Sequence, residues 1–462
     1  MIRIFRHYIP SFILVTAFAE LVMMFFACDL AWRWRLIQGG LPHEPIETRL
    51  WALLSYACVM SIALIGAGFY EIGTLRSGRQ SVLRLIVGLT IGLISLSVLF
   101  YLLNIVPIWR SIFLASIQLS FLGVLFVRFV LDRLIGWRRL QRPVVVLGAG
   151  KRALKIEELT KYKNVGFFVA AYIRMSPEET EIERAVDFSR IQSLPHFCEM
   201  KGAQNLILTL EDQQSQLPIR DLLAAKMNGL KIMEVGTFIE QVAGRVDLEV
   251  VTFRQLIFSD GFKSPEIPAM LLKRVFDIIV SILLLVLTTP LLVTVALVIR
   301  LTSKGPVLYR QKRVGQYGQI FEILKFRSMY AQSEAEGQPK WAQVNDPRIT
   351  AVGRIIRATR IDELPQAVNV LQGKMSFIGP RPERPYFVDE LSRKIPMYGE
   401  RHIMKPGITG WAQLNFPYTA STSEARTKLE YDLYYIKNYS LFLDFLIFLH
   451  TIKVILWQDG AR

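Results

Sequence analysis

The first third of the chain alternates long apolar runs with short polar segments. Four runs approach the roughly 20 residues that span the hydrocarbon core of a bilayer. They cover Phe12–Ala31, Trp51–Tyr70, Val82–Leu103 and Ile112–Leu131. This pattern predicts four transmembrane helices within residues 1–141. Nine arginines lie at the N-terminus, in the second loop and at the exit of the fourth run, against four in the opposite loops. The positive-inside rule therefore places the N-terminus and everything after Arg142 in the cytoplasm.

A fifth apolar run, Val275–Ile299, has a different pattern. Thr288, Thr289 and Pro290 stand near its middle, and basic residues flank both of its ends. Proline lacks a backbone N–H and clashes with the preceding turn, so a helix kinks or breaks there. We predict a re-entrant hairpin over residues 275–299, broken at Pro290, that enters and leaves the cytoplasmic leaflet. The alternative is a kinked span, which would place the rest of the chain outside the cell.

Residues 142–262 alternate strand and helix patterns. The β-branched run Val144–Leu147 precedes a G-x-G-x-x-A turn that begins at Gly148, and a helical pattern follows over Leu154–Tyr162. Further strand patterns cover Phe167–Ile173, Asn205–Leu210 and Lys231–Glu234. This context is typical of a Rossmann-like α/β domain. The sequence shows no clear acidic residue at the end of the second strand that could hold a ribose. Two alternatives therefore stay open: a domain that binds a nucleotide, and a non-catalytic or regulatory module.

Composition fits a membrane protein with a cytoplasmic part. The 462 residues carry a net charge of +16, and 52% are hydrophobic while only 20% are charged. Such a chain is too apolar to be disordered or wholly soluble. Three cysteines without a CxxC pattern exclude a disulfide framework. The predicted fold is a four-helix membrane region, a Rossmann-like middle domain and an α/β catalytic domain, residues 263–462, with the Pro-broken re-entrant helix. The basic excess favours phosphates and lipid head groups as partners.

The chemistry-bearing residues lie downstream of the fifth run. Lys325 and Arg327 are two residues apart and would share one side of a strand, which suits a diphosphate. Pro365 is tolerated only in the first turn of a helix, so we expect a helix to start near Asp362, with Asp362 as its N-cap. Asp362 and the adjacent Glu363 could flank one phosphate there. A plain capping aspartate with a solvated glutamate is the alternative.

From Lys273 to the C-terminus the chain resembles the bacterial sugar transferase family, the monotopic phosphoglycosyl transferases. The motifs that carry the resemblance are KRVFD, GPVLYRQKRVG, KFRSM, DELPQ, GPRPE, KPGITGWAQ and YDLYYIKNYS. The upstream part is similar to the long members of this family, the polyprenyl-phosphate sugar-phosphate transferases of exopolysaccharide assembly. Their reaction moves sugar-1-phosphate from a UDP-sugar to polyprenyl (undecaprenyl) phosphate, releases UMP and initiates assembly.

The resemblance also implies roles for individual residues. Asp362 would attack phosphorus and carry a covalent intermediate, and Glu363 would bind Mg²⁺, the one cofactor that we expect. Phosphate or nucleotide contacts are assigned to Lys325, Arg327, Arg357 and Arg381. Additional candidates are Lys312, Arg313, Glu383 and Asp432. The expected partners are a UDP-sugar, polyprenyl phosphate and membrane lipids, without nucleic acid. We expect the bacterial inner membrane, with the catalytic domain on its cytoplasmic face.

Two other functions compete with this interpretation. The first is a membrane-anchored nucleotide-binding regulatory protein with an inactive transferase domain, against which the intact DELPQ, KFRSM and GPRPE motifs argue. The second is an oxidoreductase or dehydratase, which would need a Tyr-x-x-x-Lys pair that residues 166–261 lack. The sequence does not identify the sugar, the task of the middle domain, the role of Glu20 in the first run, or whether the chain forms a homo-oligomer.

Overall fold

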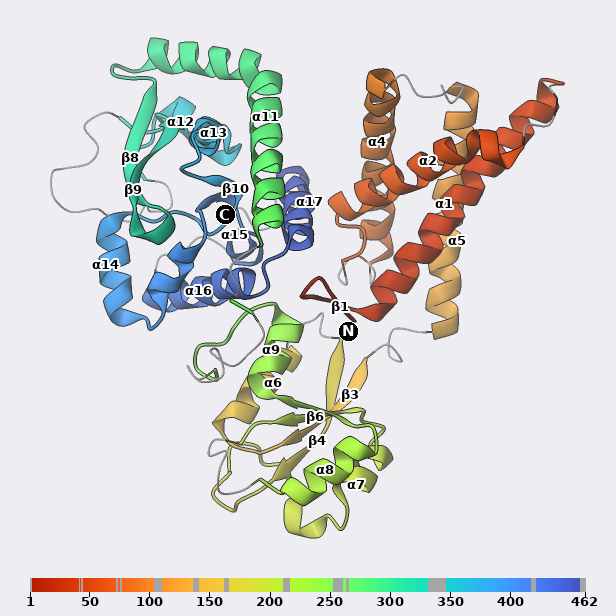
Figure 1. Cartoon of the computed structure of the whole chain (residues 1–462), viewed down its shortest axis with the longest axis vertical. Coiled ribbons are helices and arrows are strands. Elements are labelled where there is room, and N and C mark those ends of the chain that lie inside the picture. Colours follow the sequence, from red (N-terminus) through yellow and green to blue (C-terminus); the bar gives the residue numbers. More distant parts are fainter. Residues whose placement is uncertain are drawn as a thin grey trace. The chain divides into compact units, whose positions relative to one another are not determined.

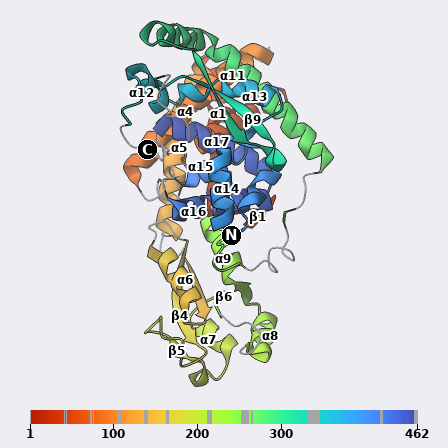
Figure 2. The ribbon, with the colours of Figure 1, turned by 90° about the vertical axis from the view of Figure 1, so that its left-hand side faces the viewer.

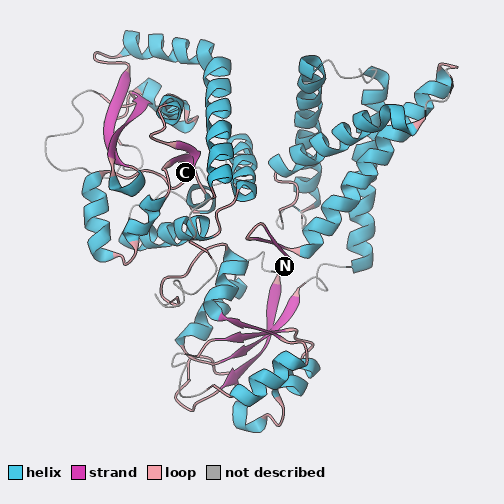
Figure 3. Cartoon of the chain, in the orientation of Figure 1, coloured by secondary structure: helices cyan, strands magenta, loops and turns pink. Residues whose placement is uncertain are grey.

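A computed structural model describes residues 2–40, 42, 45–71, 74, 77–103, 110–135, 141–161, 166–210, 217–251, 261–262, 266–330, 346–416 and 421–457. The chain divides into two compact units, Met1–Thr252 and Phe253–Arg462, and each is described by itself. Figure 3 shows that the first unit combines a purely helical bundle with a separate group of strands and helices. The predicted boundary after residue 262 adjoins residues outside the described ones and stays a prediction.

Long apolar helices build the first part of the N-terminal unit (Figure 1). They are α1 (Ser11–Gln38), α2 (Ile46–Gly66), α4 (Gly78–Leu103) and α5 (Arg110–Ile135), after a small hairpin of β1 (Ile2–Ile4) and β2 (His7–Ile9). By length and composition each of the four helices could span a membrane. The second one ends four residues earlier than its apolar run, because Gly68 adopts φ +73° and the amide of Phe69 closes the helix on the carbonyl of Leu64.

A buried ion pair joins two helices of this bundle. Glu20 in α1 is fully buried, and its carboxylate accepts from Nε of Arg128 in α5 at 2.9 Å. The Arg128 guanidinium also lies over the ring of Phe69, 3.3 Å from its centroid, and donates to the Phe69 carbonyl at 3.1 Å. Because a buried charge is tolerated only when it is paired and hydrogen-bonded, this contact gives Glu20 a structural role.

The second part of this unit is a five-stranded parallel sheet. Its strands are β3 (Arg142–Leu147), β4 (Phe167–Arg174), β5 (Val186–Asp187), β6 (Asn205–Leu208) and β7 (Lys231–Glu234). They lie in the order β5-β4-β3-β6-β7, so the first strand is central and the order reverses between β3 and β6. This is the order of the first five strands of a Rossmann fold. The four predicted strands are confirmed, whereas the pattern missed β5, which has only two residues.

Helices cover both faces of the sheet (Figures 1 and 2). They are α6 (Lys151–Lys161) and α9 (Val235–Ala243) on one face, and α7 (Leu194–Met200) and α8 (Ile219–Met227) on the other. Alternate residues of β3 face opposite ways, as a strand requires. Val144 and Val146 join the core formed with α6 and α9, while Val145 and Leu147 join the core formed with α7 and α8.

The second unit begins with the helix α11 (Ile267–Thr302), which contains Pro290. Figures 1 and 2 show this helix turning sharply between two straight arms. Pro290 has no N–H to donate to the preceding turn. The hydroxyls of Thr288 and Thr289 donate to the carbonyls of Leu284 and Leu285, each at 2.6 Å, a contact that also bends helices. The predicted break is therefore a bend inside one helix.

Two small sheets and short helices make up the rest of this unit. An antiparallel pair joins β8 (Leu308–Val314) to β9 (Ile320–Phe326), and a parallel pair joins β10 (Ser376–Ile378) to β11 (Gly407–Thr409). The helical elements are α12 (Ala351–Ala358), η3 (Ile361–Glu363), α13 (Gln366–Leu371), α14 (Pro385–Lys394), η4 (Tyr398–Ile403), α15 (Trp411–Asn415), α16 (Thr422–Lys437) and α17 (Leu441–Trp457).

The KRVFD segment fixes the first arm of α11 to this unit. Arg274 donates to the carbonyls of Val370 and Leu371, at 2.6 and 2.8 Å, at the end of α13. Lys273 pairs with Asp444 of α17 at 2.8 Å. Asp277 is buried and accepts from Ser376 Oγ at 3.0 Å and from the Phe377 amide at 2.9 Å, both in β10. Charged side chains of an apolar helix thus bind three separate elements.

Removing the Asp277 carboxylate should destabilise the second unit. In Asp277→Ala the Phe377 amide and the Ser376 hydroxyl stay buried without their acceptor, which costs about 2–4 kcal/mol. Thermal unfolding of the purified full chain measures the change. Glu390→Ala is the matched control, because Glu390 forms only a solvated pair with Lys394 and should stay within about 0.5 kcal/mol. Equal melting temperatures for the two variants would contradict this stabilising role of Asp277.

Candidate active site

The acidic pair Asp362 and Glu363 lies in the short turn η3 between α12 and α13. Arg360, just before it, has φ +56° and interrupts the helical path. Pro365 directly precedes α13 with φ −61°, which suits a helix start. The expectation that Asp362 caps this helix is therefore wrong: α13 begins four residues later, and Asp362 makes no capping bond.

Asn369 connects this turn to the strand beside it. Its Nδ2 donates to the Glu322 carbonyl at 2.8 Å, and its Oδ1 accepts from the Leu324 amide at 2.9 Å. The side chain is almost fully buried and ties α13 to the edge of β9. This contact brings η3 within reach of Lys325, the next residue of β9. The sequence carried one weak signal for it, a polar Asn within the apolar stretch after DELPQ.

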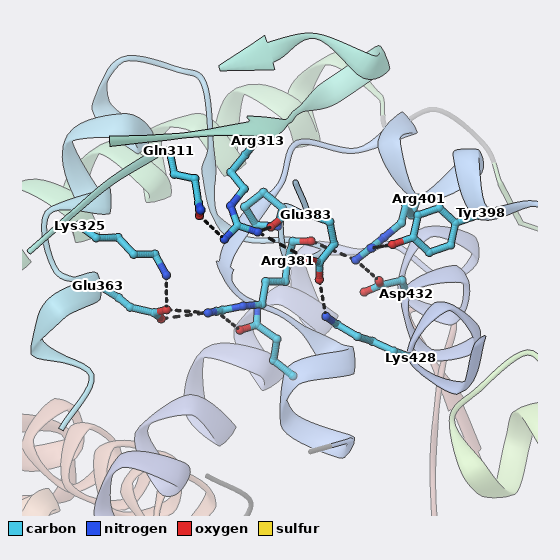
Figure 4. Close-up of polar contacts among 12 residues, drawn as sticks. Gln311, Arg313, Lys325, Glu363, Arg381, Glu383, Tyr398, Arg401, Lys428 and Asp432 are labelled. Atoms are coloured by element: carbon cyan, nitrogen blue, oxygen red, sulfur yellow. Dashed lines mark hydrogen bonds and ion pairs between the residues drawn. The ribbon is translucent and has the colours of Figure 1, made fainter. Parts of the chain in front are cut away.

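Glu363 is held between two cations (Figure 4). Its Oε1 lies 2.8 Å from Lys325 Nζ and 2.6 Å from Arg381 Nη2, while Oε2 meets Arg381 Nη1 only at 3.5 Å. Arg381 also donates to Gln413 Oε1 of α15 at 3.1 Å. Burial alone would raise the pKa of Glu363, but Arg381 and Lys325 outweigh it and hold this pKa well below its usual range. Glu363 is therefore a fixed carboxylate.

Asp362 differs from Glu363 in its partners and in the direction of its pKa shift. Its side chain is 8% exposed and makes no hydrogen bond or ion pair with any residue that the structure describes. Burial, followed by the charge of Glu363, raises its pKa to about 6, although Lys325, Arg357 and Arg381 oppose this shift. Two adjacent carboxyls with opposite shifts are suited to different tasks. The free one lies close to cations, as a nucleophile toward a phosphate must.

A buried network holds the backbone that carries Arg381 (Figure 4). Arg401 of η4 is 3% exposed and donates from Nη2 to the Arg381 carbonyl at 3.0 Å and to Asp432 Oδ2 at 2.7 Å. Its Nη1 donates to the Tyr398 hydroxyl at 2.7 Å. Asp432, a candidate site residue, therefore supports the backbone of Arg381 through Arg401. Sequence reasoning missed Arg401 and Tyr398, which stand outside the family motifs.

The other flank of Arg381 is fixed by Glu383. Its carboxylate meets Lys428 of α16 at 2.8 Å and Arg313 of β8 at 3.5 Å. Burial would raise the pKa of Glu383, yet Lys428, Arg401 and Arg313 lower it to about 2. Arg313 also donates to the Pro382 carbonyl at 3.1 Å. The predicted residues Arg313 and Glu383 thus position the GPRPE segment.

Two predicted residues lie away from the acidic pair, and the third, Arg357, lies close enough to act on it through its charge. Arg327 is buried at the end of α11, where Nη2 donates to the Ser303 carbonyl at 2.8 Å and to the Ser303 hydroxyl at 2.7 Å. The structure therefore does not bring Arg327 to the pair Asp362 and Glu363, called the dyad below. The reason is that β9 ends at Phe326, and a cation suits the last turn of a helix. Lys312 is exposed on β8 opposite Glu322. Arg357 in α12 acts on Asp362 through its charge.

The fold and this site define a membrane-associated α/β protein whose buried acidic pair lies among basic side chains. Comparison with known proteins gives the family. Residues 268–458 match the family model of the bacterial sugar transferases, and residues 66–224 match that of a CoA-binding domain. The chain belongs to the bacterial sugar transferase family.

Relatives support this assignment along most of the chain. An undecaprenyl-phosphate galactose phosphotransferase of Salmonella typhimurium is 30% identical over 359 residues, 72% of this chain and 71% of the relative. A UDP-N-acetylgalactosamine-undecaprenyl-phosphate N-acetylgalactosaminephosphotransferase of Aeromonas hydrophila is 44% identical over 243 residues, and the chain spans about half of its length (56%). A UDP-glucose:undecaprenyl-phosphate glucose-1-phosphate transferase of Caulobacter vibrioides is 41% identical over 208 residues, 45% of this chain and 78% of the relative.

Asp362→Asn should stabilise the folded protein at neutral pH. A carboxyl whose pKa rises from 3.8 to about 6 on folding binds its proton more tightly in the folded state, so stability falls as the pH rises through this window. Above pH 6 the ionised Asp362 carboxylate lowers the free energy of unfolding by about 3 kcal/mol as an upper bound. Thermal unfolding should show a higher melting temperature for the variant at pH 7.5, and the difference should shrink toward pH 4. The control is Asp389→Asn, at an exposed residue. A lower melting temperature for Asp362→Asn would contradict the assigned environment.

Proposed function

We propose that the chain transfers sugar-1-phosphate from a UDP-sugar to undecaprenyl phosphate through a covalent intermediate on Asp362, and so initiates exopolysaccharide assembly. One observation carries the proposal: a free, buried Asp362 stands beside a Glu363 that two cations hold in place. A carboxylate can attack phosphorus when positive charge offsets the repulsion between the anions. The names of the relatives support the same substrates.

The reaction takes two steps on one site. An oxygen of the Asp362 carboxylate attacks the phosphorus that bears the sugar, and the bond from this phosphorus to the UMP oxygen breaks. UMP leaves with that electron pair. A phosphate oxygen of the polyprenyl phosphate then attacks the sugar-phospho-aspartate, the new diphosphate bond forms, and the Asp362 carboxylate is released. Lys325 and Arg381, which face Glu363 at 2.8 and 2.6 Å, neutralise charge in both steps.

Glu363 is our candidate ligand for Mg²⁺. Its Oε2 makes only the 3.5 Å contact with Arg381, which leaves this oxygen available to one cation. Among the described residues no group of three acidic, histidine or cysteine side chains gathers around a point. A site with one carboxylate fits Mg²⁺, which typically takes one or two carboxylates together with phosphate oxygens. When bound, the ion would neutralise charge on the donor diphosphate.

The membrane arrangement completes the proposal. The bent helix α11 exposes apolar side chains on both arms, including Leu272, Leu283, Val293 and Leu297. As a re-entrant hairpin it would keep both basic ends, and with them the dyad, on the cytoplasmic face of the inner membrane. The helices α1, α2, α4 and α5 would span the same membrane. A soluble donor and a lipid acceptor then meet at head-group depth.

Incubation with a UDP-sugar and no lipid should leave a sugar-phosphate on the peptide that contains Asp362. UDP-N-acetylgalactosamine, UDP-glucose and UDP-galactose are the donors to test. Mass spectrometry of the digested protein detects the adduct, and the release of UMP measures turnover with undecaprenyl phosphate.

Asp362→Asn should lose both signals, by about a thousandfold or more, while the exposed-site variant Asp389→Asn keeps them. Ping-pong kinetics should accompany the adduct. Substantial turnover by Asp362→Asn would exclude this nucleophile. A folded wild-type chain that releases no UMP from any donor would favour the inactive, regulatory alternative.

The hairpin predicts that both ends of α11 lie on one side of the membrane. Met270 and Leu301 are 52% and 84% exposed, so cysteines there should be accessible in a chain whose native Cys28, Cys58 and Cys198 are replaced by alanine. A membrane-impermeant maleimide should label Met270→Cys and Leu301→Cys in inside-out vesicles and neither in right-side-out vesicles. Labelling of the two positions from opposite sides would show that α11 crosses the membrane.

A further inference from the structure

The glycine turn of the middle domain lies where Rossmann-like folds bind a phosphate. It follows β3, at the point where the strand order reverses between β3 and β6, and it leads into α6. In such folds the turn and the helix N-terminus receive a diphosphate. Gly148 has φ +116°, and a Cβ there would lie 2.5 Å from Thr209 Oγ1. The turn itself is therefore built as in a nucleotide-binding domain.

A carboxylate of the chain occupies the anion position of this turn. The amide of Ala149, the middle residue of G-x-G, donates to Glu179 Oε2 at 2.9 Å. The amide of Met175, at the end of β4, donates to the same oxygen at 3.0 Å. Glu179 lies five residues beyond β4 and not at the strand end, where the sequence pattern of a Rossmann-like domain places an acidic residue. Its carboxylate oxygen stands where a ligand phosphate oxygen would accept these bonds.

Arg174 fixes the loop that carries Glu179, and Arg152 is bound to a backbone carbonyl. Arg174 donates from Nε to the Glu179 carbonyl at 2.9 Å and from Nη2 to the Ile182 carbonyl at 3.3 Å. Arg152, the second residue of α6, donates to the Leu210 carbonyl at 2.8 Å. The Ala149 amide and the Arg152 guanidinium, two groups that could bind a diphosphate at this turn, are thus engaged within the protein.

We propose that the middle domain keeps a nucleotide-binding fold but has closed its phosphate site with Glu179. The domain then holds neither a dinucleotide nor coenzyme A at the glycine turn, in contrast to the CoA-binding family model that it matches. Glu179 acts as a built-in replacement for the phosphate and fixes the β3–α6 turn to the loop after β4. This proposal concerns a site separate from the transferase dyad and does not depend on its activity.

Binding of the two nucleotide cofactors tests the closed site directly. The full chain in lipid nanodiscs, titrated calorimetrically with coenzyme A and with NAD⁺, should show no saturable binding up to about 1 mM. Saturable binding of either compound by the wild-type chain, lost in Gly148→Ala, would overturn the proposal.

Hydrogen exchange of the full chain tests the replacement itself. In Glu179→Ala the amides of Ala149 and Met175 lose their acceptor, so peptides that contain them should exchange about tenfold faster. Inorganic phosphate should restore their protection in the variant and leave the wild type unchanged. Glu178→Ala, which changes the adjacent exposed carboxylate, is the matched control. Exchange that is equal in the two variants, or that phosphate does not slow in Glu179→Ala, would contradict the assignment of Glu179 to the anion position.

Discussion

The ion pairs of Glu363 with Lys325 and Arg381 are the constraint on which the site depends. They join a strand, a short turn and the segment after β10, which lie far apart in the sequence. In a buried place two adjacent carboxyls cannot both ionise at little cost. Because Glu363 takes both short cation contacts, its neighbour Asp362 keeps no partner among the described residues and a pKa near 6. Glu363 orders the site, and Asp362 is the nucleophile of the proposed reaction.

The same logic links the apolar helix to the dyad. Arg274 of α11 donates to the last carbonyls of α13, and α13 begins three residues after Glu363. Asp277 fixes the same helix to β10, from which the chain runs directly to Arg381. The first arm of α11 is thus attached to both sides of the Glu363–Arg381 pair. A helix that sits in a leaflet at a set depth would set the depth of the chemistry through these bonds.

Local patterns in the sequence predicted the features that depend on neighbouring residues, namely helices, strands and the bend at a proline. Hydrophobic patterns found the long apolar helices and four of the five strands of the parallel sheet, and Pro290 marked the bend of α11. The failures are of another kind. Arg327 shares the spacing of a phosphate-binding residue but closes the end of α11, because β9 stops one residue earlier. Asn369 and Arg401 organise the site through contacts with residues 47 and 31 positions away, and no local pattern encodes such a distance.

Two glutamates of this chain occupy positions that suit a phosphate, and they differ in the donors that hold them. Glu363 accepts from the side chains of Lys325 and Arg381, which have rotatable bonds and can turn toward an incoming diphosphate without moving the backbone. Glu179 accepts from the backbone amides of Ala149 and Met175, which the β3 turn and the end of β4 hold in place. Under the proposed function a substrate would compete for the first pair of donors, whereas the second pair would be released only if a whole loop moved. Under the two proposals, the same carboxylate chemistry would leave cations that a substrate can engage in one unit and would form a structural contact in the other.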